Sequence, residues 1–123
     1  MRWDIGDHGF QMTLSPRVPG VIKRGISDWL ESWLAIHDLR SDLVAGWAVH
    51  PGGRDILEGV RRGLDLPESA LAASHRILEQ RGNMSSGTIL WVLSALLDEL
   101  ESGPIVGLSF GPGLTGEAVL FTK

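Results

Sequence analysis

The chain of 123 residues is long enough for one compact domain and too short for two of ordinary size. It contains no cysteine, which excludes disulfides, thiolate metal ligands and a cysteine nucleophile from this polypeptide. The formal net charge is −4 and there is no basic tract, so the chain offers little to neutralise a nucleic-acid backbone. No apolar run reaches the roughly 20 residues of a membrane span, and no export signal is visible, so we predict a cytoplasmic protein.

The first forty residues predict a strand or hairpin followed by a helix. Apolar residues between Trp3 and Leu14 alternate with polar ones, which is typical of strands. After the proline-containing stretch 15–20, apolar residues recur at helical spacing and predict a helix over about residues 20–38. His37 lies at the end of this stripe, where we interpret it as a packed or capping residue.

The apolar run 43–49, which stops at a histidine, is the centre of the chain. Its nearly continuous apolarity indicates a strand that is buried on both faces, as in a parallel sheet, and therefore predicts helices on both sides. His50 would stand at the carboxyl end of this strand, where open α/β sheets usually hold their ligands. From the residues alone, His50 is either a structural residue at the strand end or part of a site.

Two amphipathic segments follow, at 53–64 and 67–81, and both predict helices. Gly82 fits a C-terminal cap of the second one, because a positive φ costs glycine little. The adjacent Arg61 and Arg62 are interpreted as a solvated helix face, with phosphate binding as the alternative.

The helix predicted at 88–100 is apolar nearly all round, which indicates burial on all sides. The chain has no obvious second layer to cover its outer side, so we predict an exposed apolar patch that binds a second copy or a missing half. Strands are expected at about 105–110 and 117–122. The glycine-rich connection between them suits a hairpin tip or a cavity wall.

Three separated motifs, HPGG at 50–53, GNMSS at 82–86 and FGPGLT at 110–115, agree with one family. In this order they resemble the C-terminal half of a chalcone/stilbene synthase, a type III polyketide synthase of the thiolase superfamily. The resemblance implies an α/β fold, the C-terminal half of a thiolase-like αβαβα fold, with a mixed sheet of about four strands packed with helices. It covers 1–123 as one domain, and the N-terminal half with the nucleophilic cysteine is absent from this chain.

The resemblance also implies an activity. Family members are homodimers that load an acyl group from coenzyme A onto the cysteine and extend it with malonyl-CoA by decarboxylative condensation. His50 and Asn83 resemble the catalytic histidine and asparagine, which donate hydrogen bonds to the thioester oxygen as the enolate forms. His50 would also form an ion pair with the cysteine thiolate. Coenzyme A thioesters are the substrates, and neither a metal nor another cofactor is implied.

Further positions resemble the family's substrate cavity and pantetheine channel. The expected cavity residues are Met12, Ser85, Phe110, Gly111, Pro112 and Gly113, and the backbone of Gly52 and Gly53 would approach the coenzyme A arm. The chain also departs from the family pattern: Met12 replaces a gatekeeping phenylalanine, and Ser109 replaces a glycine. The starter acyl group is therefore not transferred from the resemblance.

Two functions stay open. The chain is either the C-terminal part of an acyltransferase that works with an N-terminal half, or a non-catalytic half-fold that serves as an interaction or dimerisation domain. In both cases we expect it to be inactive alone.

Without the resemblance, Asn83 would be interpreted as an N-cap of the apolar helix. His8 beside Asp7 lacks further metal ligands at recognisable spacing.

Overall fold

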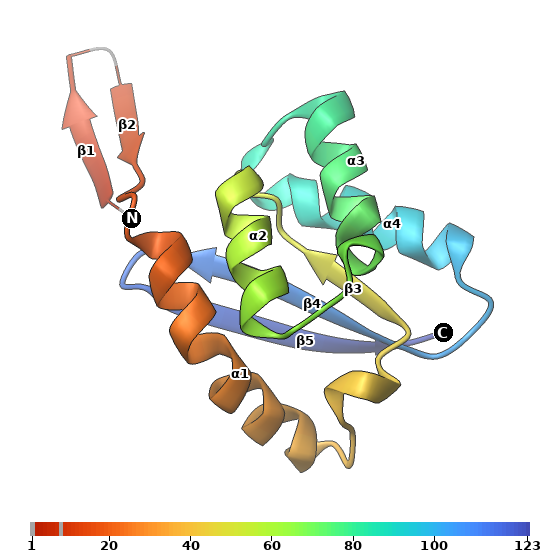
Figure 1. The fold of residues 1–123 in the computed structure, drawn as a ribbon. Coiled ribbons are helices and arrows are strands. Elements are labelled where there is room, and N and C mark those ends of the chain that lie inside the picture. The colour runs from red at the N-terminus through yellow and green to blue at the C-terminus, as the bar shows by residue number, and fades with distance from the viewer. Residues whose placement is uncertain (1, 8) are drawn as a thin grey trace.

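A three-stranded mixed sheet with helices on both faces forms the centre of the molecule (Figure 1). The computed structural model describes residues 2–7 and 9–123, without the side chains of residues 2, 3 and 10–12. Within this part of the chain the strands are β1 (Arg2–Gly6), β2 (Gly9–Thr13), β3 (Gly46–Val49), β4 (Pro104–Gly111) and β5 (Thr115–Thr122). The helices are α1 (Val18–Ile36), α2 (Arg54–Gly63), α3 (Ala72–Arg81) and α4 (Thr88–Glu99), with short 3-10 helices η1 (Ser41–Leu43), η2 (Glu68–Leu71) and η3 (Ser85–Gly87).

The main sheet has the order β3-β4-β5, with β3 parallel and β5 antiparallel to β4. Trp47 lies opposite Val106 and Val49 opposite Leu108. All four residues of β3 are buried, so the predicted strand with two covered faces is confirmed. The strand is shorter than the apolar run, because residues 41–43 form η1 and Leu43 is exposed.

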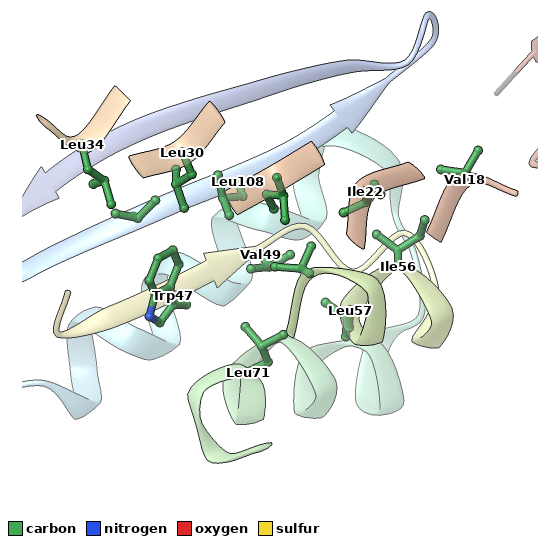
Figure 2. Close-up of a cluster of buried hydrophobic side chains, with 13 residues drawn as sticks. Val18, Ile22, Leu30, Leu34, Trp47, Val49, Ile56, Leu57, Leu71 and Leu108 are labelled. Atoms are coloured by element: carbon green, nitrogen blue, oxygen red, sulfur yellow. The ribbon is translucent and has the colours of Figure 1, made fainter. Parts of the chain in front are cut away.

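Each face of this sheet has its own layer of helices. On one face, α1 and α2 pack over alternate residues of β3 and β4, as Figure 2 shows for Leu30, Leu57, Val49 and Leu108. On the other face, α3 and α4 cover Ala48 together with Ile105. The helical stripe predicted for the first helix is confirmed, and its buried residues recur every four positions: Val18, Ile22, Ile26, Leu30 and Leu34.

The N-terminal strands pair only with each other among the described residues. β1 and β2 form an antiparallel hairpin that stands apart from the main sheet in Figure 1. The main sheet therefore has three strands where about four were expected, because alternation along the hairpin did not reveal its pairing partner. His8 and the side chain of Met12 lie outside the described residues.

Helices α1 and α2 approach each other closely through two glycines of α2. A Cβ atom on Gly59 would lie 2.8 Å from the carbonyl oxygen of Pro19, and one on Gly63 would overlap the side chain of Ile26. Real Cβ atoms essentially never come this close to a backbone oxygen. The absence of these two side chains therefore sets the separation of the two helices.

One side of α4 carries exposed apolar residues. Val92 and Leu96 are buried, whereas Leu90, Trp91 and Leu97 are 65%, 45% and 36% exposed. The prediction that the chain leaves this helix partly uncovered is confirmed, and we call these three residues the exposed α4 face. Among the described residues, no helix is long and apolar enough to cross a membrane.

In the α1/α2 layer, we predict that replacing two different glycines by alanine has opposite effects on the free energy of unfolding. Gly59→Ala presses the new Cβ against the Pro19 carbonyl, and overpacking of this kind lowers the free energy of unfolding by about 1–3 kcal/mol. Gly25→Ala, in α1 with nothing within 4 Å of the new Cβ, should raise it by about 0.5–1 kcal/mol because alanine favours helices. Urea unfolding followed by circular dichroism measures both, and equal effects would contradict the close approach.

Candidate functional site

A cavity of about 410 Å³ lies at the carboxyl ends of β3 and β4. It collects residues from the exit of β2, the end of β3, the start of α2, the segment before α4 and the β4–β5 connection. Its lining residues are Leu14, His50, Gly52, Ile56, Asn83, Ser85, Ser86, Ser109, Phe110, Gly111 and Pro112. These side chains include no acidic group, arginine or lysine, so an uncharged polar cluster stands in an otherwise apolar wall.

The sheet fixes the backbone of His50. Its amide N–H donates to the carbonyl oxygen of Leu108 at 2.8 Å, so the pairing of β3 with β4 continues one residue past the strand. Ring atom Nδ1 is buried and has no hydrogen-bond partner among the described residues. A buried nitrogen without a proton tolerates this better than a buried N–H, so we assign the ring proton to Nε2. Burial also lowers the pKa of His50 below 6.5, which makes the ring neutral at pH 7.

The side chain of Asn83 joins the His50 segment to the turn that precedes α4. Its Nδ2 donates to the carbonyl oxygen of Gly52 in a long hydrogen bond of 3.4 Å, and its Oδ1 accepts the N–H of Ser85 at 2.9 Å. An amide nitrogen carries two hydrogens, so the second can donate to a ligand in the cavity. The cap of α4 is Gly87 rather than Asn83, so the interpretation of Asn83 as an N-cap of this helix is wrong.

The β4–β5 connection forms one wall of the cavity, and Thr115 holds its shape. The hydroxyl of Thr115 donates to the carbonyl oxygen of Pro112 at 2.8 Å. Gly113 has a φ of 141°, and a Cβ atom there would lie 2.8 Å from that hydroxyl oxygen, so this position needs glycine. At the start of β5, a Cβ atom on Gly116 would lie 3.3 Å from the ring of Trp29. The connection is thus both a hairpin tip and a cavity wall.

Most residues that the sequence pointed to lie on this cavity. The lining includes the predicted His50, Asn83, Gly52, Ser85, Phe110, Gly111 and Pro112. Gly53 and Gly113 are chain neighbours of lining residues without lining the cavity themselves.

Sequence reasoning missed four lining residues: Leu14, Ile56, Ser86 and Ser109. Signals for two of them were present. Leu14 belongs to the alternating apolar pattern that predicted a strand or hairpin between Trp3 and Leu14. Ile56 begins the apolar stripe of α2, next to the turn that leaves His50. The two serines are direct neighbours of the predicted Ser85 and Phe110.

Arg61 and Arg62 do not line the cavity, and both bind Glu58 on their own helix. Arg61 donates through Nε at 2.7 Å and through Nη2 at 2.9 Å, and Arg62 donates through Nε. These hydrogen bonds lower the pKa of Glu58 to about 2. The pair is therefore engaged within α2, with Arg62 exposed and Arg61 half-buried, which favours the interpretation of a solvated helix face over phosphate binding.

The arrangement provides uncharged N–H donors on one cavity, with His50 half-buried and Asn83 exposed in this chain. Donors of this kind stabilise negative charge that develops on an oxygen, provided that they point at one position. The lining residues do not include a cysteine, because the chain has none. The chemistry that these residues can supply is therefore stabilisation of an oxyanion, without a cysteine nucleophile.

Residues 1–123 match the family model described as chalcone and stilbene synthases, C-terminal domain. A relative named 1,3,6,8-tetrahydroxynaphthalene synthase, from Streptomyces peucetius subsp. caesius, is 36% identical over 121 residues, which are 96% of this chain and 32% of that protein. A putative chalcone synthase from Bacillus subtilis (strain 168) is 32% identical over 127 residues, 99% of this chain and 34% of the relative. The chain thus spans about a third of the length of these curated relatives.

Solved structures agree with the sequence comparisons. The crystal structure of PKS-I from the brown alga Ectocarpus siliculosus superposes with a TM-score of 0.90 at 33% identity, over 97% of this chain and 34% of that one. A mutant of CsyB superposes with a TM-score of 0.87 at 27% identity, over 99% and 35% of the two chains. The predicted α/β class and thiolase-type half-fold are confirmed.

We predict that the His50 ring titrates below 6.5 in the isolated chain, because burial disfavours the imidazolium. The lowered pKa also determines how the free energy of unfolding changes with pH. As the pH falls below 6.5, the histidine of the unfolded chain is protonated before that of the folded chain, so the free energy of unfolding decreases. Two-dimensional NMR of the ring carbons measures the pKa, and the His50→Gln variant identifies the resonance. A His50 pKa above 6.5 would contradict the neutral, buried ring.

Proposed function

The chain belongs to the chalcone and stilbene synthase family, whose C-terminal domain it matches, and we propose that it is the C-terminal part of a type III polyketide synthase. The proposed reaction is decarboxylative condensation of malonyl-CoA with an acyl-CoA starter. Relatives are named as a putative chalcone synthase and as a polyketide synthase-like protein, which supports the class of reaction. Coenzyme A thioesters are the substrates in this proposal, and no metal or further cofactor takes part.

One observation carries the proposal. His50 and Asn83 come from distant parts of the chain, yet they line one cavity and are connected through Gly52, whose carbonyl oxygen accepts the Asn83 amide. Structural residues at a strand end and a turn have no need to face a shared cavity. Two uncharged N–H donors on one cavity support the proposal, because an enolate oxygen is stabilised by donors of this kind.

The proposed chemistry begins with malonyl-CoA. The bond between its carboxylate carbon and its α-carbon breaks, carbon dioxide leaves, and the electron pair moves into the thioester to give an enolate. Nε2–H of His50 and Nδ2–H of Asn83 stabilise the negative oxygen, each contributing about 3 kcal/mol as in comparable oxyanion holes. The α-carbon of the enolate then attacks the acyl thioester on the cysteine. The cysteine thiolate leaves as the new carbon–carbon bond forms.

The nucleophilic cysteine belongs to the N-terminal half in this proposal. A thiolate beside His50 would raise the pKa of the ring, because an opposite charge favours the imidazolium. Acylation removes that charge, and burial then returns the ring to its neutral form. His50 would thus hold the thiolate before loading and serve as a neutral N–H donor during condensation.

The remaining cavity residues shape the space for the growing chain in this proposal. Ser85 and the wall formed by Phe110, Gly111 and Pro112 border it, with Met12 and Gly113 proposed beside them. The backbone of Gly52 and Gly53 would approach the pantetheine arm. A cytoplasmic location stays a prediction from the sequence.

We propose that the N-terminal half covers the exposed α4 face, and that the completed protein is a homodimer. Burying a leucine that is now exposed contributes about 1.5–3 kcal/mol. Leu90 and Leu97 are seven positions apart and therefore share one side of the helix. The guanidinium of Arg81 lies 3.7 Å from the ring centre of Trp91, which keeps part of this face in a defined position.

The catalytic assignment is tested by grafting this chain onto the N-terminal portion of the Streptomyces peucetius relative. We expect release of labelled carbon dioxide from malonyl-CoA, and a loss of about 100-fold or more in either His50→Ala or Asn83→Ala, because each removes one oxyanion donor. His37→Ala, at the exposed end of α1, is the matched control and should retain the rate. Equal rates in the unsubstituted graft and both variants would instead favour a non-catalytic interaction domain.

The proposed partner surface gives a separate prediction for the isolated chain. We expect it to bind an apolar dye and to self-associate in sedimentation, because the exposed α4 face is uncovered. The double substitution Leu90→Gln and Leu97→Gln should reduce both, whereas Leu43→Gln, at a site 60% exposed in η1, should not. A well-behaved monomer without dye binding would count against this surface.

A further inference from the structure

Two polar side chains are fully buried among the described residues, Ser74 of α3 and Thr88 of α4, both with 0% exposure. A buried hydroxyl must form hydrogen bonds, because losing its contact with water otherwise costs free energy. The partners of these two hydroxyls lie in the segments that carry His50 and Asn83. Neither Ser74 nor Thr88 lines the cavity itself.

Ser74 holds the peptide group that precedes the His50 side chain. Its Oγ donates to the carbonyl oxygen of Val49 at 2.8 Å, and Val49 is the last residue of β3. The N–H of the same peptide group belongs to His50 and donates to Leu108 at 2.8 Å. Because a peptide group is planar, hydrogen bonds at both of its ends fix its plane. That plane is one of the constraints on the direction in which the His50 side chain leaves the backbone.

Thr88 holds the turn that begins at Asn83. Its Oγ1 accepts the N–H of Met84 at 2.8 Å and donates to the carbonyl oxygen of Ser85 at 2.8 Å. Ser85 has a φ of 62°, a left-handed conformation that is unfavourable for residues other than glycine. The Asn83 side chain itself binds the N–H of Ser85. Thr88 therefore maintains the strained turn on which the direction of the Asn83 amide depends.

We propose that Ser74 and Thr88 are positioning residues, which fix the backbone beside His50 and Asn83 so that both N–H donors point at one position in the cavity. The effect on reaction rate rests on the proposed function, whereas the effect on the two side chains does not. Each hydroxyl comes from a helix of the α3/α4 layer. The α3/α4 layer therefore contacts the backbone of both segments that carry the proposed donors, although Ser74 and Thr88 do not line the cavity.

The test uses variants that remove each hydroxyl with little change in volume, Ser74→Ala and Thr88→Val. Thr88→Ser keeps both hydrogen bonds and serves as the conservative rescue. Ile77→Val, which removes one buried methylene from α3, is the control for a loss of packing alone. Circular dichroism and urea unfolding select conditions in which every variant is folded.

The first readout is NMR on the isolated chain. In Ser74→Ala we expect the His50 pKa to move toward 6.5, because a loosened strand end admits water to the ring. In Thr88→Val we expect the side-chain amide resonances of Asn83 to shift, while Thr88→Ser and Ile77→Val leave both readouts near their original values. Unchanged His50 and Asn83 signals in folded Ser74→Ala and Thr88→Val would overturn the proposal.

The second readout is condensation by the grafted protein. We expect kcat to fall by about 10- to 100-fold in Ser74→Ala and Thr88→Val, as for small misplacements of catalytic groups, with KM nearly unchanged and kcat retained in Thr88→Ser. If His50→Ala and Asn83→Ala abolish activity while Ser74→Ala and Thr88→Val keep full kcat, the positioning role is overturned. If His50→Ala and Asn83→Ala have no effect, the proposed function fails, and the NMR readout still decides the positioning role.

Discussion

The buried pairing of β3 with β4 is the constraint on which the rest of the structure depends. β3 has only four residues, all buried, so both of its faces need a layer of helices. The α1/α2 layer covers Trp47 and Val49, and the α3/α4 layer covers Ala48. The chain leaves this strand at His50 and turns at once, so the burial of four apolar residues delivers the histidine to the carboxyl end of the sheet. The close approach of α1 and α2 and the buried hydroxyls of the other layer serve that same strand.

Elements whose patterns are local could be predicted, and elements that depend on pairing could not. The apolar stripe of α1 and the continuous apolarity of β3 are properties of neighbouring residues, so both elements appeared within a few positions of their predicted places. The 3-10 helices at Ser41–Leu43 and Glu68–Leu71 have no such signature. A stretch of three or four residues is too short for its apolar pattern to distinguish the hydrogen bonds of a 3-10 helix from those of an α-helix. The hairpin of β1 and β2 shows the other limit: alternation along a strand reveals its faces, but not the strand beside it.

The same division applies to the candidate site. His50 and Asn83 lie in recognisable motifs, and the glycine-rich sequence of the β4–β5 connection predicts a tight turn. These residues could therefore be named from the sequence. Ser74 and Thr88 could not, because serine and threonine on helices are mostly exposed and nothing in their spacing marks a buried hydroxyl. The sequence also allowed Asn83 to be interpreted as a helix cap, because its distant hydrogen-bond partner cannot be seen in the sequence. Its partner at Gly52 is 31 positions away, and only the folded chain brings the two together.

The protonation of His50 in this chain follows from its surroundings. In the chain alone, burial without a nearby charge keeps the ring neutral. The same partial burial would strengthen the interaction of the ring with a charge placed beside it, because an ion pair gains more in less polar surroundings. In the proposed function, a thiolate beside this ring would favour its protonated form, and acylation of the thiolate would return it to the neutral form. The hydrogen bonds at both ends of the peptide group between Val49 and His50 would then help the proposed function, because one ring on a fixed backbone would serve both as a cation that holds the thiolate and as a neutral donor to the enolate.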